Sequence, residues 1–89
     1  MKIFVGGVSS RGWAIITAAL PDADLVLGSC EKEPQRWRKQ CKHCAVAVLQ
    51  TKFLSHKHVE ALRGAGLTNI VFSNGGINGM IEAIRNCTA

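Results

Sequence analysis

The chain has 89 residues, with no tyrosine, only two prolines, and six acidic residues against eleven basic ones. No apolar run approaches the roughly 18 residues that span a membrane, and the N-terminal stretch MKIFVGG is too short for a signal peptide. We therefore expect a cytoplasmic protein that does not enter a membrane. Its hydrophobic content of 47% excludes a disordered chain.

The length fits a single domain, residues 1–89, with a small core. A core of limited size is often supplemented by association, so we expect a homodimer.

Basic residues are concentrated in the middle of the chain. Residues 31–63 contain eight lysines and arginines against three glutamates, which accounts for the whole net charge of +5. Such a surface attracts anions. Because no recognised nucleic-acid motif accompanies the charge, we interpret it as a solvated helix face and do not expect nucleic acid as a partner.

Four short apolar runs alternate with helical patterns. Strands are predicted at 2–5, 24–27, 45–49 and 69–72, and helices at 13–20, 35–42, 55–63 and around the apolar stripe Ile77, Met80, Ile81 and Ile84. Ser10 is the predicted N-cap of the first helix. The alternation predicts an α/β fold, a four-stranded parallel sheet with helices on both faces and the flavodoxin- or Rossmann-like order 2-1-3-4.

This topology sends every loop that follows a strand to the carboxyl edge of the sheet, where ligands bind in open α/β folds. The candidate site residues there are Gly6, Gly7, Ser10, Arg11, Cys30, Ser55, His56, Asn74 and Gly75.

The loop from Gly6 to Arg11 suits an anion. Its glycines let the backbone approach a ligand, while hydroxyls and the Arg11 guanidinium donate hydrogen bonds. The loop has neither a Walker pattern nor the dinucleotide glycine pattern, so a tight strand-to-helix turn explains it equally well. The same two interpretations apply to Asn74-Gly75-Gly76.

His56 opens the third helix directly beyond a buried strand. Imidazole and thiolate are ligands of transition metals and haem, so His56, with Cys30 at the same edge, is a candidate metal site. His58 lies two residues further on and is expected to point elsewhere. The alternative for His56 is a hydrogen-bonded surface residue.

Cys41 and Cys44 have the spacing of a redox dithiol or of half a zinc site. They follow a helix C-terminus, where a thiolate is disfavoured, and belong to the far end of the sheet. Unliganded thiols are the favoured interpretation, and a structural zinc site completed by Cys87 or His43 is the alternative.

Three stretches, MKIFVGGVSSRGW, CAVAVLQTKFLSHKHV and IVFSNGGINGMIEAI, resemble the bacterial domain-of-unknown-function family 2325 over essentially the whole chain. The resemblance implies a compact Rossmann-like domain and no established reaction. It favours functional roles for Arg11 and His56. Such sequences often have an aromatic hydroxyl after the arginine, whereas this chain has Trp13, which argues against a tyrosine-based ligand role.

The first hypothesis is a sensor, carrier or redox protein that binds haem or a transition metal through His56, with Arg11 pairing a propionate and the cofactor near a dimer interface. The alternative is a module that binds a nucleotide or another anionic, phosphorylated small molecule at the loop from Gly6 to Arg11. A third hypothesis is an enzyme that draws its nucleophile and base from Ser55, His56 and Cys30. Glu60 is then the nearest carboxylate to orient His56.

Overall fold

The computed structural model of the protein describes residues 1–28, 34–51 and 55–88. Strands and helices alternate along the chain as β1 (Lys2–Gly6), α1 (Ser10–Ala19), β2 (Asp24–Leu27), α2 (Gln35–Gln40), β3 (Cys44–Gln50), α3 (His56–Gly64), β4 (Ile70–Ser73) and α4 (Gly76–Thr88). The strands form one parallel sheet in the order β2-β1-β3-β4, which confirms the predicted fold class and strand order.

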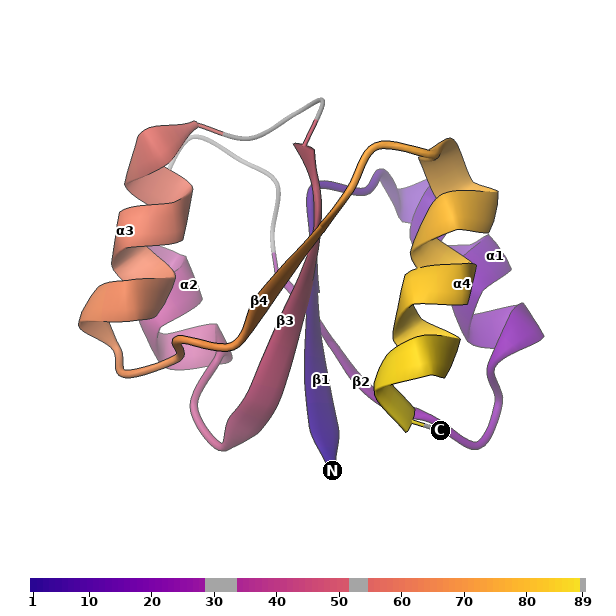
Figure 1. Cartoon of the computed structure of the whole chain (residues 1–89), viewed down its shortest axis with the longest axis horizontal. Helices are drawn as coiled ribbons and strands as arrows, with labels where there is room; N and C mark the ends of the chain where they lie inside the picture. Colours follow the sequence, from indigo (N-terminus) through magenta and orange to yellow (C-terminus); the bar gives the residue numbers. More distant parts are fainter. Residues whose placement is uncertain (29–33, 52–54, 89) are drawn as a thin grey trace.

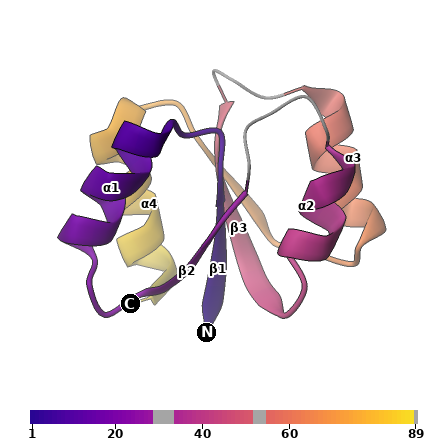
Figure 2. The ribbon, with the colours of Figure 1, turned by 180° about the vertical axis from the view of Figure 1, so that it is seen from behind.

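Helices cover both faces of the sheet (Figure 1). α1 and α4 pack on one face, α2 and α3 pack on the other, and the view from behind gives the same arrangement (Figure 2). Both chain ends lie at the amino edge of the strands. The carboxyl edge is therefore left to the loops that carry the candidate site residues.

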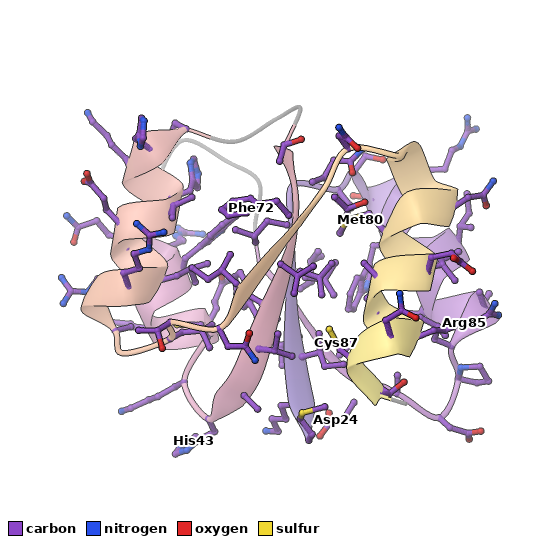
Figure 3. The ribbon with its side chains drawn as sticks, viewed as in Figure 1. Asp24, His43, Phe72, Met80, Arg85 and Cys87 are labelled. Atoms are coloured by element: carbon purple, nitrogen blue, oxygen red, sulfur yellow. The ribbon has the colours of Figure 1, made fainter. Side chains whose placement is uncertain are left out.

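The alternation of side chains along the two central strands divides the core into two clusters. The cluster under α1 and α4 contains Ile3, Val5, Val8, Ile16, Val46, Val48, Met80, Ile81 and Ile84. The cluster under α2 and α3 contains Phe4, Trp37, Cys41, Ala47, Leu49, Leu62 and Leu67. Met80 illustrates the first cluster, since it lies between α4 and the sheet (Figure 3).

Trp37 anchors the six-residue helix α2 and is fully buried. The Phe4 ring meets it edge to face, with ring centroids 5.1 Å apart and an interplanar angle of 68°. On β1, a Cβ atom added at Gly6 would stand 2.6 Å from the Trp37 ring. Gly6 is therefore needed because the indole occupies the space that any side chain would take.

The prediction that Ser10 caps the first helix is wrong by one residue. The Ser9 hydroxyl oxygen accepts a hydrogen bond from the Gly12 N–H at 3.1 Å, and Ser9 has the extended backbone of an N-cap. Ser10 is the first helical residue and is exposed. The physical reason is that Ser9, three positions before Gly12, has the spacing that a capping oxygen requires.

Within the described ranges, no helix combines the length and the apolar character needed to cross a membrane.

A pair of glycine-to-alanine substitutions tests the packing of β1 against Trp37. Gly6→Ala should lower the free energy of unfolding by about 1–3 kcal/mol, because the added methyl overpacks the Trp37 ring. Gly64→Ala is the matched control: the nearest group to its added methyl is the Arg38 guanidinium, at 3.6 Å, so it should be neutral or stabilise α3 by up to about 1 kcal/mol. Urea unfolding measures both, and equal effects would contradict this account of Gly6.

Candidate ligand-binding site

The sheet has a topological switch point between β1 and β3. β1 is followed by α1 and the edge strand β2, whereas β3 is followed by α3 and the opposite edge strand β4, so the chain leaves the two central strands toward opposite faces (Figure 1). Open α/β sheets bind ligands in the crevice beyond the carboxyl ends of two such strands.

A cavity of about 340 Å³ lies at this point, on the α1 and α4 side of the sheet. This switch-point crevice is lined by Gly7, Val8, Ser9, Gln50, Asn74, Gly76 and Ile77. Small-molecule pockets occupy roughly 300–1,000 Å³. The switch-point crevice therefore fits one small metabolite and is too small to enclose a macrocycle.

Gly7 forms the wall of the crevice where the loop after β1 passes the end of β3. Its φ angle is +82°, and a Cβ atom there would stand 2.8 Å from the backbone oxygen of Gln50. Both the backbone angle and the close approach require glycine. The two strand ends are therefore held nearer to each other than any side chain at position 7 would permit.

Gln50 is the polar residue at the floor of the crevice. It follows Val46 and Val48 at alternate positions of β3, so it faces the same side of the sheet as they do. Its side chain is only 6% exposed, and its Oε1 atom has no hydrogen-bond partner among the described residues. Leaving a buried acceptor unpaired costs about 1–3 kcal/mol, so such a group calls for an explanation such as a ligand or a water.

The N-termini of α1 and α4 both open onto the crevice, through Ser9 and through Gly76 and Ile77. The first N–H groups of a helix lack acceptors within the helix and favour anions. Neither helix has an acidic residue in its first turn. An anionic group would therefore be favoured at the rim of the crevice.

The start of α4 is built from small residues. The Gly79 N–H donates to the Gly75 carbonyl at 3.2 Å, and a Cβ atom at Gly75 would stand at the same distance from the Gly79 backbone. Gly75 thus serves the tight first turn of α4, beside the crevice lining.

The other candidates from the first and fourth loops have different surroundings. Gly7 and Asn74 line the crevice, whereas Ser10 and Arg11 are exposed on the first turn of α1 and are not part of its lining. Gly6 is buried against Trp37 on the opposite face of the sheet. Sequence reasoning missed Gln50, which the alternation along β3 would have assigned to the inner face.

His56 and Ser55 line a second hollow, between α3 and the edge strand β4. This His56 depression has a volume of about 290 Å³ and is lined by Thr51, Ser55, His56, Val59, Arg63 and Phe72. Phe72 is 49% exposed and extends from β4 on the α3 side (Figure 3). Arg63, which sequence reasoning did not single out, brings a positive charge to this hollow, whereas Arg11 lies in the helical layer on the other face.

His58 has separate contacts, as predicted. Its Nδ1 atom is 2.8 Å from the Ser55 hydroxyl oxygen, and its ring centroid is 4.6 Å from that of Trp37. The Ser55 hydroxyl is therefore paired with His58, three residues along the helix, and not with His56. This spacing, which places two side chains on one helix face, was the available signal for the pair.

Cys30 is outside the described residues, so its predicted role as a second metal ligand beside His56 stays a prediction. In the described parts of the chain, no cluster of three or more histidine, cysteine, aspartate or glutamate side chains is positioned to hold a metal ion.

The other three cysteines lie toward the amino edge of the sheet. Cys87 packs against the core cluster under α1 and α4, whereas Cys41 belongs to the cluster under α2 and α3 and Cys44 packs against that second cluster. The structure does not bring Cys87 together with the other two thiols, so the zinc site completed by Cys87 stays a prediction that this arrangement does not support. Burial raises the pKa of all three thiols above the ordinary value.

A larger hollow, of about 420 Å³, lies between α2 and α3 on the outer surface. It is lined by Pro34, Gln35, Arg38, Lys57, Glu60 and Ala61. Its charged side chains are exposed to solvent, and the Arg38 guanidinium already donates to the Gly64 carbonyl at 3.4 Å. Its lining residues come from α2, α3 and the residue before α2, and not from the sheet, so we give the smaller switch-point crevice more weight.

The chain matches no protein-family model and no curated protein. The resemblance to family 2325 stays a prediction.

Replacing the Gln50 amide tests whether its buried, unpaired oxygen lowers the stability of the free protein. Gln50→Met keeps the approximate shape of the side chain and removes the unpaired acceptor, so the free protein should become more stable by about 1–3 kcal/mol in urea unfolding. A loss of stability of that size would show instead that the amide makes favourable contacts in the free protein.

Proposed function

We propose that the protein is a binding domain for a small anionic metabolite, a nucleotide or a sugar phosphate, held in the switch-point crevice. The observation that carries this proposal is the buried Oε1 atom of Gln50, which has no hydrogen-bond partner among the described residues. A ligand bound at the switch point of the open sheet would supply the missing donor.

The surroundings of the crevice define the chemistry of this ligand. Gln50 Oε1 calls for an N–H or O–H donor at the floor, and the starts of α1 and α4 favour a negative charge at the rim. A nucleotide or a sugar phosphate has both groups in one molecule. Arg11, on the exposed first turn of α1, would add long-range attraction for the phosphate.

Thermal unfolding with four probes tests the proposal: adenosine monophosphate, ribose 5-phosphate, inorganic phosphate and adenosine. A probe that carries both a phosphate and a hydrogen-bond donor for Gln50 should stabilise the protein by about 2.7 kcal/mol at a concentration of about 100 times its Kd. Inorganic phosphate or adenosine at the same concentration should stabilise the protein less. Gln50→Met should weaken binding of the probe with both groups by about tenfold or more, because it removes the acceptor.

Two arginine substitutions with the same change of charge serve as controls for the phosphate. Arg11→Ala should weaken phosphate-bearing probes only. Arg85→Ala should have no effect, because Arg85 lies on the last turn of α4 and points away from the sheet (Figure 3). Stabilisation by none of the four probes, or equal binding by the Gln50→Met variant, would count against the switch-point crevice as the site.

A second candidate function is the binding of haem or a transition metal at the His56 depression. It is favoured by the half-exposed Phe72, which lies with His56 and Arg63 around one hollow. An apolar surface, an imidazole ligand and a cation are the groups that a haem with its propionates would need. Because the depression is open, we propose that a second copy of the chain covers the cofactor in a homodimer.

The absorbance and metal content of the purified protein, and a haemin titration, test this candidate. A Soret band should appear with haemin and be lost in His56→Ala, while His43→Asn, at the amino edge of the sheet, should retain it (Figure 3). Gln50→Met should also retain the Soret band, because Gln50 lies on the other face of the sheet. The experiments can therefore reject either candidate function without rejecting the other. An unchanged haemin spectrum in His56→Ala, together with absence of metal in the wild-type protein, would exclude His56 as the ligand.

A further inference from the structure

We infer that Cys41 and Cys44 form a reversible disulfide within one chain, so that the turn between α2 and β3 is a site of oxidation by small-molecule disulfides. This inference does not depend on the proposed function, because the turn lies at the amino edge of the sheet, away from the switch-point crevice.

The backbone holds the two cysteines at the ends of one tight turn. The Cys44 N–H donates to the Cys41 carbonyl at 3.0 Å, and His43 between them has a φ angle of +69°. A turn closed in this way brings its first and fourth Cα atoms within about 7 Å. Disulfides require a Cα separation of about 4.4–6.8 Å, so the pair is within reach without a rearrangement of the fold.

The two side chains also lie on the same face of the sheet. Cys41 is buried in the core cluster under α2 and α3, and Cys44 packs against that cluster. Burial is the largest cause of the raised pKa of Cys44, and a negative charge on Cys41 adds to it, as expected of neighbouring thiols. Cys87 lies across the sheet and is not available to either thiol.

The exchange begins at Cys44, which is half-buried, whereas Cys41 is only 4% exposed. The Cys44 thiolate attacks one sulfur of the small disulfide, which forms a mixed disulfide and releases one small thiolate. The Cys41 thiolate then attacks the Cys44 sulfur and releases the second small thiolate. The two cysteines lose two protons and two electrons in total, and the small disulfide is reduced to two thiols.

The surroundings predict slow exchange. Burial raises the pKa of both thiols, and the nearby charges of Arg38 beside Cys41 and of Lys2 beside Cys44 only partly oppose this effect, while Asp24 adds to it. The reactive thiolate is therefore scarce at neutral pH. These properties fit a slowly oxidised pair and not a catalytic dithiol.

The test uses the wild-type chain and a Cys30→Ser, Cys87→Ser variant, each incubated with oxidised glutathione at about pH 8, where thiolate is more abundant. The intact mass of the variant should fall by two hydrogen atoms, with no free thiol left after denaturation. In the wild-type chain, trypsin cuts after Lys42, so the peptide of residues 40–42 should be found linked to that of residues 43–52. Dithiothreitol should release the two peptides.

Cys44→Ser in the otherwise wild-type chain should abolish this linked pair, and Cys87→Ser should leave it unchanged. Circular dichroism of each variant establishes that the fold is retained. A pair linked instead through Cys30 or Cys87, a disulfide between two chains, or two thiols that stay reduced while oxidised glutathione is in excess would overturn the inference.

Discussion

The end of β1 has no side chain at two consecutive positions, and the rest of the molecule depends on this constraint. The Trp37 ring occupies the space that a side chain at Gly6 would need on one face of the sheet. The backbone of Gln50, at the end of β3, occupies the space that a side chain at Gly7 would need. The first contact fixes α2, whose only buried residue is Trp37. The second draws the strand ends together and forms the wall of the switch-point crevice.

The two faces of the sheet thereby acquire different chemistry. On the α1 and α4 side, a buried amide oxygen lies below two helix N-termini, which suits a small anionic ligand with a hydrogen-bond donor. On the α2 and α3 side, aromatic packing dominates: Trp37 lies between Phe4 and the His58 ring, and His58 in turn contacts the Ser55 hydroxyl. His56 is left exposed beside Phe72, outside this aromatic group.

The fold could be predicted because each strand is a short apolar run ended by glycine or polar residues, and each helix follows such a run. The candidate site was only partly predictable. Gly7 and Asn74 were found, because loops after parallel strands share one edge. The importance of Gln50 was missed, because a buried acceptor without a partner is a property of tertiary packing, invisible in a residue that merely ends an apolar run. The pairing of Ser55 with His58 was also missed, although the three-residue spacing between them was a local signal for it.

A titration followed by amide nuclear magnetic resonance tests the central claim most directly. Adenosine monophosphate added to labelled protein should shift the side-chain amide signals of Gln50 and the backbone signals of Gly7 and Gly76, because these groups line the proposed site. Signals of Arg38 and Lys57, in the hollow between α2 and α3, should not move. Shifts confined to that outer hollow, with the Gln50 amide unchanged, would contradict the account.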